Sequence, residues 1–164
     1  MTDLDILKSL NCPENVIKHC ITVSKNAGAI AEGVKIKIDK ELVERGAMFH
    51  DIGRCKTHGI DHGIAGARII REFGLGEGIA KIAERHIGAG ITSEEARTIG
   101  LPPGDYCPKS AEEKIVAYAD NLTMGSKIIS SEESIMRFKK MLGENHPSLK
   151  RMEDLHIEVQ SWMG

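Results

Sequence analysis

Hydrophobic residues recur every three or four positions along most of the chain, and this spacing predicts helices nearly everywhere. The clearest case is the segment 12–35, in which Pro13 suits the first helical turn. Its apolar stripe consists of Val16, Cys20, Val23, Ala27 and Ile30. The same pattern predicts further helices over 39–51, 61–73, 77–88, 110–124, 131–142 and 147–163.

Capping residues and glycines indicate where these helices begin and end. Asp39 is placed to cap the helix of 39–51 and Gly53 to stop it, whereas Ser110 and Glu113 have the spacing of a capping box. Clear strand alternation is absent, and VKIKID, residues 34–39, is the only short strand candidate. The pattern therefore favours an all-α fold, a compact helical bundle.

A chain of 164 residues is long enough for one domain, 1–164, with its own hydrophobic core. The last two predicted helices, within 131–163, carry apolar residues at helical spacing, which favours packing onto the rest of the domain. Covering a cleft or forming a homodimer contact are the alternatives for these helices. The irregular segment 89–108, rich in Gly and Pro, is a candidate lid.

Charge and hydropathy exclude several classes of function. The chain has 22 Lys and Arg against 24 Asp and Glu, a net charge of −2, without the basic excess typical of general nucleic-acid binders. No run of about 18 apolar residues is present, so no membrane span is expected. The acidic N-terminal residues 1–10 do not resemble a signal peptide. A cytoplasmic protein is the simplest interpretation.

The four cysteines form no C-x-x-C motif, which argues against a zinc ribbon or a thioredoxin-type site. Cys20 has the position of a small core residue on a helix. Because cytoplasmic thiols stay reduced, free thiols are also expected for the others, Cys12, Cys55 and Cys107.

Several polar side chains fall on apolar helix faces, where they are costly without a partner. His19 lies between Val16 and Val23, and Asp120 follows Val116 by one turn. Each has an ordinary explanation when taken alone. A buried histidine can be satisfied by one hydrogen bond, and a buried carboxylate can cap a neighbouring helix.

The dipeptide His50–Asp51 is a stronger signal. It lies in AMFHDIGRCKTHGIDHGIAGARII, 47–70, which combines three His and two Asp with Gly, Ala and Ile. Consecutive helical residues point about 100° apart, so both can bind one ion only in a crease between helices or where the backbone loosens. Gly53 allows such a close approach. Imidazole and carboxylate together suit Mn, Fe, Co, Ni or Zn.

The ordered set of His19, the HD of 50–51 and the Asp of KIVAYADNL resembles the H…HD…D pattern of the HD-domain metal-dependent phosphohydrolases. HDIGR resembles their HDIG subgroup, and DHGIAGARII resembles the H-x-x-x-G-A segment that follows it. The resemblance covers about residues 13–125. It implies a helical HD domain, here with two extra C-terminal helices, and four ligands of one metal ion: His19, His50, Asp51 and Asp120.

The resemblance also bears on a second ion. In HD proteins with two metals, histidines from the segments of His62 and His86 hold the second ion and the aspartate equivalent to Asp51 bridges the pair. Alternatively, these two histidines only hydrogen-bond phosphate or the ligands of the first ion. One or two divalent ions per chain are therefore expected, either a transition metal or Mg. The best-known two-metal subgroup has Lys after HDIG and a GYP signature further along the chain. Here Arg54 and Cys55 follow HDIG and no GYP is present, which argues against hydrolysis of cyclic di-GMP.

The implied reaction is the hydrolysis of a phosphoester of a nucleotide-like small molecule by water activated at the metal. Asp51 and Asp120 are catalytic candidates through the metal. Arg54 is the first candidate for a phosphate clamp, because its guanidinium fork matches two phosphate oxygens. An ordinary surface charge is the alternative for Arg54.

Other residues have weaker claims to a role at this site. Asp61 is favoured as a helix N-cap over an orienting carboxylate, and surface positions are expected for His146 and His156. Arg85 and Lys56 are weaker candidates for a contact to phosphate, and His58 is a weak candidate for lining the cleft. Tyr106 and Tyr118 are weak candidates for stacking on a base.

Two functions of other classes remain open at this point. One is a metal- or nucleotide-binding regulatory module without catalysis. The other is a di-iron oxygenase on the same fold. Retention of the complete H…HD…D set argues against loss of catalysis.

Overall fold

A computed structural model describes residues 1–164 and confirms the all-α class. It contains nine α-helices, one short 3-10 helix and one two-stranded hairpin. No helix combines the length and the apolar character that crossing a membrane requires. The elements are α1 Asp3–Ser9, α2 Glu14–Gly33, α3 Lys40–Phe49, η1 Ile52–Cys55, α4 His62–Glu72, α5 Glu77–Glu84, α6 Ser93–Thr98, α7 Ala111–Asn121, β1 Thr123–Met124, β2 Lys127–Ile128, α8 Ser131–Leu142 and α9 Pro147–Trp162.

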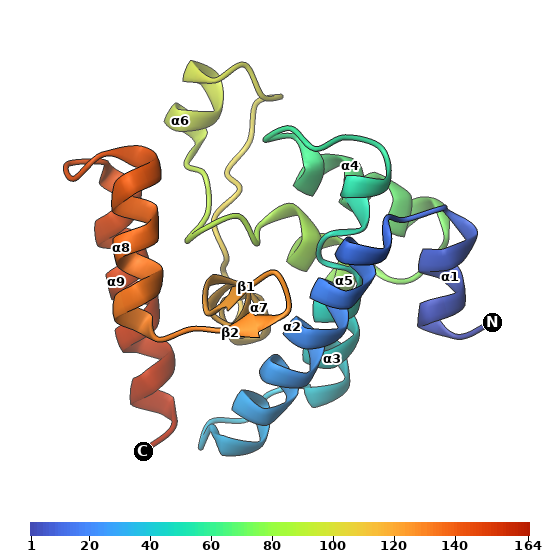
Figure 1. Ribbon diagram of the computed structural model, residues 1–164, viewed down its shortest axis with the longest axis horizontal. Helices are drawn as coiled ribbons and strands as arrows, with labels where there is room; N and C mark the ends of the chain where they lie inside the picture. The colour runs from blue at the N-terminus through green and yellow to red at the C-terminus, as the bar shows by residue number, and fades with distance from the viewer.

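Helix α7 lies at the centre of the molecule (Figure 1). It packs against α2 and α3 on one side and against α9 on the other, and α8 runs beside α9. Helices α4 and α5 pack on each other beyond α3. This order places α7 between the N-terminal helices and the C-terminal pair.

The apolar side chains are buried in two clusters. The first joins α2, α3, α7 and α9 and includes Met152. The second joins α1, α2, η1, α4 and α5 and includes Leu7. The carboxyl end of α3 lies where the clusters meet, since Ala47 belongs to the first and Phe49 to the second. The residue that follows, His50, is therefore fully buried at the junction.

The predicted helix starts are largely confirmed. The Asp39 side chain accepts a hydrogen bond from the Leu42 amide and caps α3. Ser110 accepts one from the Glu113 amide at the start of α7. The reciprocal half of the capping box is absent, because the Glu113 carboxylate accepts instead from the Lys109 amide and the Ser110 hydroxyl.

The prediction that Gly53 stops α3 is wrong, because the helix already ends at Phe49. Gly53 lies within η1, where it allows the close approach expected of it: a Cβ atom there would overlap the carbonyl oxygen of His62. Glycine at 53 therefore brings η1 against the start of α4.

Two further element predictions are wrong in detail. Residues 34–39 form no strand, since no extended partner lies beside them, and the only strands pair Thr123–Met124 with Lys127–Ile128 around a turn at Gly125. Helix α5 ends at Glu84 rather than near Gly88.

The expectation of free thiols at Cys12 and Cys55 is wrong, because the two residues form a disulfide. Their Cα atoms lie 4.8 Å apart, within the range that a disulfide spans. The fold brings the loop before α2 beside η1. The two cysteines are 43 residues apart in the sequence, so their proximity could not be predicted from it, and the argument from reduced cytoplasmic thiols says nothing about distance. Cys20 is a buried free thiol in the core, as predicted, and Cys107 is also free.

Candidate metal centre

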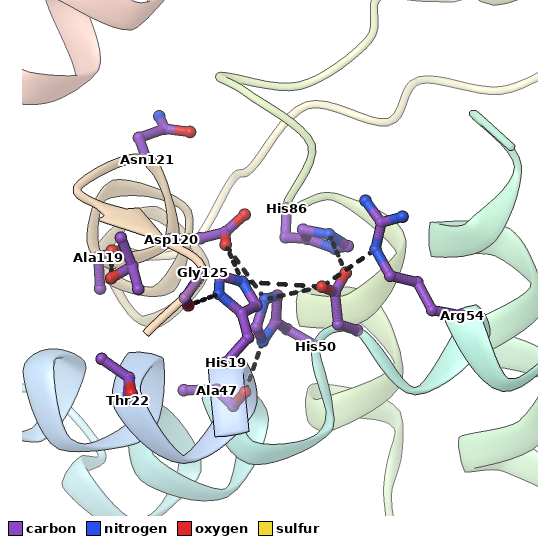
Figure 2. Close-up of polar contacts among 12 residues, drawn as sticks. His19, Thr22, Ala47, His50, Arg54, His86, Ala119, Asp120, Asn121 and Gly125 are labelled. Atoms are coloured by element: carbon purple, nitrogen blue, oxygen red, sulfur yellow. Dashed lines mark hydrogen bonds and ion pairs between the residues drawn. The ribbon is translucent and has the colours of Figure 1, made fainter. Parts of the chain in front are cut away.

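The six predicted ligand residues converge on one site, although they come from separate elements. Figure 2 shows the rings of His19 and His50 close to the carboxylate of Asp120, which reaches them from α7. Three of the six follow or end helices rather than lying inside them: His50 at the end of α3, Asp51 before η1, and His86 after α5. Because the regular helix ends at these positions, the side chains of His50 and Asp51, which are adjacent in the sequence, can both point into the same site.

Hydrogen bonds to the backbone determine the tautomer of the four histidine rings. In each ring Nδ1 lies within 2.6–2.8 Å of a main-chain carbonyl oxygen. A carbonyl only accepts, so each Nδ1 carries the proton, which leaves the neutral form of each ring with an unprotonated Nε2 that faces the site. The pairs are His19 with Gly125, His50 with Ala47, His62 with Gly59 and His86 with Ala83.

The two oxygens of the Asp51 carboxylate face different pairs of histidines. Oδ1 lies 3.2 Å from Nε2 of His62 and 3.2 Å from Nε2 of His86. Oδ2 lies 3.7 Å from Nε2 of His19 and 3.8 Å from Nε2 of His50. Asp51 therefore lies between two groups of ligand atoms and contributes one oxygen to each.

Asp120 completes the first group. Its Oδ1 lies 2.9 Å from Nε2 of His19 and 3.2 Å from Nε2 of His50. The second group has no further carboxylate and consists of Asp51, His62 and His86, whose ligand atoms all lie within 4.8 Å of one another.

The pKa shifts at the site show that its carboxylates favour a positive charge beside them. Burial acts to raise the pKa of Asp51 and of Asp120, yet the surrounding histidines hold both pKa values well below the usual range. Burial acts to lower the pKa of His50, but the two carboxylates raise it well above its ordinary value. For His86, burial outweighs the carboxylates and lowers the pKa. The cluster therefore attracts a cation or extra protons.

These side chains fit a divalent ion. In the neutral rings Nε2 is an acceptor only, as are the oxygens of the ionised carboxylates, and the six side chains bring these acceptors together. Such a buried set is costly unless a cation lies between its members. The His/Asp groups can therefore hold metal, and their nitrogen and oxygen ligands suit a transition metal ion.

Arg54 lies at the edge of this cluster. Its Nε donates to Oδ2 of Asp51 at 3.2 Å, and a third of its side chain remains exposed. The guanidinium also lines the cleft described next. Position and partial exposure are both compatible with the predicted contact to phosphate.

The metal centre lies on the wall of an open cleft of about 490 Å³. Five of the predicted ligands line it, with His50 buried behind them. The cleft also contains residues that the sequence did not single out. Some of these are Asn15, Ile87, Asn121, Thr123, Arg137, Phe138 and Met141. Asn121 is next to Asp120 in the sequence. For α8, the sequence offered only the alternative that the C-terminal helices cover a cleft, without naming these residues.

The weaker candidates mostly have other roles. Arg85 forms a 2.8 Å ion pair with the buried Glu113, away from the cleft. Lys56 is exposed and does not line the cleft, whereas His58 does. Asp61 occupies the N-cap position of α4 but makes no capping bond, because it accepts from Thr57 instead.

Neither tyrosine is placed to stack on a base in the cleft. Tyr106 is buried and donates to the Pro102 carbonyl, and Tyr118 packs edge-on against His156. His156 is therefore a buried residue, contrary to the expectation of a surface position, whereas His146 is half-buried and caps α9. The candidate lid 89–108 contributes no residue to the cleft.

Comparisons with known proteins identify the family and the fold. The family model for the HD domain matches residues 16–125. The chain is 54% identical to an uncharacterized protein of Methanocaldococcus jannaschii, over 96% of this chain and 95% of that protein. It is 45% identical to a tRNA (cytidine(56)-2'-O)-methyltransferase of Picrophilus torridus over 98% of this chain, but the match spans only 46% of the methyltransferase.

A solved structure shares the fold. The HD domain of the phosphodiesterase PgpH from L. monocytogenes, in complex with cyclic-di-AMP, superposes with a TM-score of 0.60 at 18% identity. The match covers 96% of this chain and 95% of that domain. The likeness extends to the arrangement of helices along almost the whole chain.

Proposed function

This chain belongs to the HD-domain family, and we propose that it is a metal-dependent phosphohydrolase that cleaves a phosphoester of a nucleotide-like molecule. The observation that carries the proposal is the position of Asp51. One of its oxygens faces His62 and His86, and the other faces His19 and His50. A carboxylate between two sets of nitrogen ligands is the arrangement that a two-metal hydrolytic site requires.

Each ion would have its own ligands. His19, His50 and Asp120 would hold the first ion, His62 and His86 the second, and Asp51 would bind both. Divalent ions in such a site polarise phosphate oxygens and make water nucleophilic at neutral pH. The backbone carbonyls that accept from Nδ1 keep the four rings oriented with Nε2 toward the ions.

Arg54 would bind the phosphate that is cleaved. Its Nε is held by Asp51, so its terminal nitrogens stay beside the metal centre. A guanidinium in this place can donate two parallel hydrogen bonds to non-bridging phosphate oxygens. This contact orients the phosphorus without occupying the ions.

The cleft supports a substrate of nucleotide size. Its volume of about 490 Å³ falls within the range usual for small-molecule sites. Amide, hydroxyl and guanidinium groups line it together with a few apolar side chains, among them Ile60, Ile87 and Met141. The PgpH domain of the same fold binds cyclic-di-AMP, which supports a nucleotide phosphoester for this chain as well.

We also propose that residues 1–164 form a single HD domain. Three side chains of α9, those of Met152, Leu155 and Val159, are buried in the same apolar cluster as residues of α2 and α3. Removal of α8 and α9 would expose this cluster.

The proposal is tested with manganese-loaded protein and two chromogenic substrates, bis(p-nitrophenyl) phosphate and p-nitrophenyl phosphate. We expect hydrolysis of at least one, and a loss of about 100-fold or more for Asp51→Ala because both ions lose a ligand. Asp154→Ala, on the exposed face of α9, is the matched control and should retain activity. Equal rates in Asp51→Ala and wild type would refute the proposal.

A further inference from the structure

Helix α8 lies outside the part of the chain that matches the HD family, yet it forms one wall of the cleft. Arg137, Phe138 and Met141 line the cleft from this helix. They lie three, four and seven residues after the fully buried Ser134, so they share one helix face with it. This face of α8 is turned toward α7 and the metal centre.

Hydrogen bonds hold α8 at a defined position beside the site. The Ser134 hydroxyl donates to the carbonyl of Asn121 at 2.7 Å, and Asn121 directly follows the ligand Asp120. At the start of the helix, the Ser131 hydroxyl lies 2.8 Å from Nδ1 of the buried His156. The wall formed by α8 is therefore fixed relative to the metal centre.

Arg137 has no carboxylate partner. It takes part in no ion pair and in no side-chain hydrogen bond, whereas Arg54, Arg85 and Arg151 all do. Its guanidinium lies over the Phe138 ring, 5.5 Å from the centroid, and Phe138 is packed against the first apolar cluster. The ring thus supports a half-buried cation whose hydrogen-bond donors are all free to bind an anion in the cleft.

We propose that Arg137 binds a second phosphate of the substrate, distinct from the phosphate that is cleaved. This inference rests on the proposed function, since Arg54 already serves the phosphate at the metal centre. Arg54 and Arg137 come from different elements, η1 and α8, and line one continuous cleft. A substrate that reaches both must carry phosphates on separate positions, as a short nucleotide chain does and a nucleoside monophosphate does not. Arg137 would therefore select for a nucleotide phosphodiester that carries a further phosphate.

The test compares three dinucleotides on manganese-loaded protein: ApA, pApA and ApAp. Each has one internal diester, and the last two carry one further phosphate at either end. For wild type we expect kcat/KM to be about tenfold higher for one of the phosphorylated forms than for ApA, the size of one charge-assisted hydrogen bond. Arg137→Ala should lose this preference while it still hydrolyses ApA.

Lys139→Ala is the matched control, because Lys139 is an exposed cation on α8 that does not line the cleft. It should keep the wild-type preference, and thermal unfolding should show both variants folded. A preference that survives in Arg137→Ala, or the absence of any preference in wild type, would overturn the inference.

A binding measurement separates this inference from the proposed function. If none of the dinucleotides is hydrolysed, the proposed function fails, and calorimetric titration of manganese-loaded protein with pApA and ApAp decides about Arg137. Weaker binding by Arg137→Ala than by Lys139→Ala supports the subsite. Equal behaviour of the two variants, including no measurable binding by either, overturns it.

Discussion

The Nε2 atoms of His62 and His86 lie 3.2 Å apart, and each lies 3.2 Å from Oδ1 of Asp51. Both rings donate a hydrogen bond from Nδ1 to a backbone carbonyl. In the neutral rings the lone pairs of the two Nε2 atoms therefore face each other and Oδ1 of Asp51, and all three residues are buried. Such acceptors repel unless a cation lies between them. This contact is the strongest reason to expect a second ion beside the one bound by the H…HD…D residues.

Replacement of His62 should therefore remove only one of the two ions. We expect His62→Ala to bind about one metal ion fewer per chain and to lose phosphoesterase activity by about 100-fold, because each metal ligand contributes strongly to affinity and rate. Elemental analysis after dialysis measures the metal. His58→Ala removes an exposed histidine from the segment before α4 and should keep the metal content of wild type. Unchanged metal content in His62→Ala would show that His62 is not a ligand.

Loss of the Arg54 guanidinium should affect substrate more than metal. We expect Arg54→Ala to lower kcat/KM by about 10- to 100-fold through the loss of a bidentate phosphate contact. Arg54→Lys should recover part of this loss, and metal content should not change. Arg68→Ala removes an exposed arginine from α4 and serves as the control. If Arg54→Ala and Arg68→Ala have the same kinetics, Arg54 is an ordinary surface charge.

The Cys12–Cys55 disulfide should stabilise the folded chain. Its loop of 43 residues restricts the unfolded ensemble, so we expect Cys12→Ser with Cys55→Ser to lower the free energy of unfolding by about 2–4 kcal/mol. Denaturant unfolding without reductant measures this change, and Cys107→Ser is the control. A thiol titration of denatured, unreduced protein should find two free thiols, Cys20 and Cys107. Four free thiols would contradict the disulfide.

The ion pair of Arg85 with Glu113 predicts a pH dependence of stability. Burial acts to raise the pKa of Glu113, but hydrogen bonds from Arg85, Lys109 and Ser110 lower it below 4.5 overall. A carboxyl group whose pKa is lower in the folded state stabilises the fold above its unfolded pKa, and this contribution is lost as the pH falls through the folded value.

We therefore expect Glu113→Gln to lower the free energy of unfolding by about 1–3 kcal/mol at pH 7. The difference from wild type should shrink below about pH 4, where the wild-type carboxyl gains a proton. Urea unfolding at a series of pH values measures both effects, with Glu94→Gln, which changes an exposed carboxylate of α6, as the reference. A difference that stays constant from pH 7 to pH 3 would contradict the assigned pKa shift.

The sequence predicted those parts of the fold that local chemistry determines. The bounds of α8 match the predicted 131–142, because an apolar stripe at helical spacing ends there at Gly143, a residue with a positive φ. The 123–128 hairpin was not foreseen, since two-residue strands are too short to show alternation. The Cys12–Cys55 disulfide joins the loop before α2 to η1, and these two segments meet only in the folded chain.

The site divides in the same way. Residues of the H…HD…D pattern were identified through the resemblance to the HD-domain family, which rests on their order and their helical contexts. The role of His62 and His86 stayed open, because spacing along the chain gives no distance to Asp51. Arg137 itself was not singled out, since its proximity to the cleft arises from the packing of α8 against α9 and from the contact of Ser134 with the end of α7.

Metal content per chain tests the dinuclear site most directly. The measurement is elemental analysis of wild-type protein and Asp51→Ala, both purified without chelators, with the metal content divided by the protein concentration. We predict about two ions per chain in wild type and almost none in Asp51→Ala, because Asp51 faces both groups of ligands. One ion or fewer in wild type, or equal content in the two proteins, would contradict a site in which Asp51 bridges two metals.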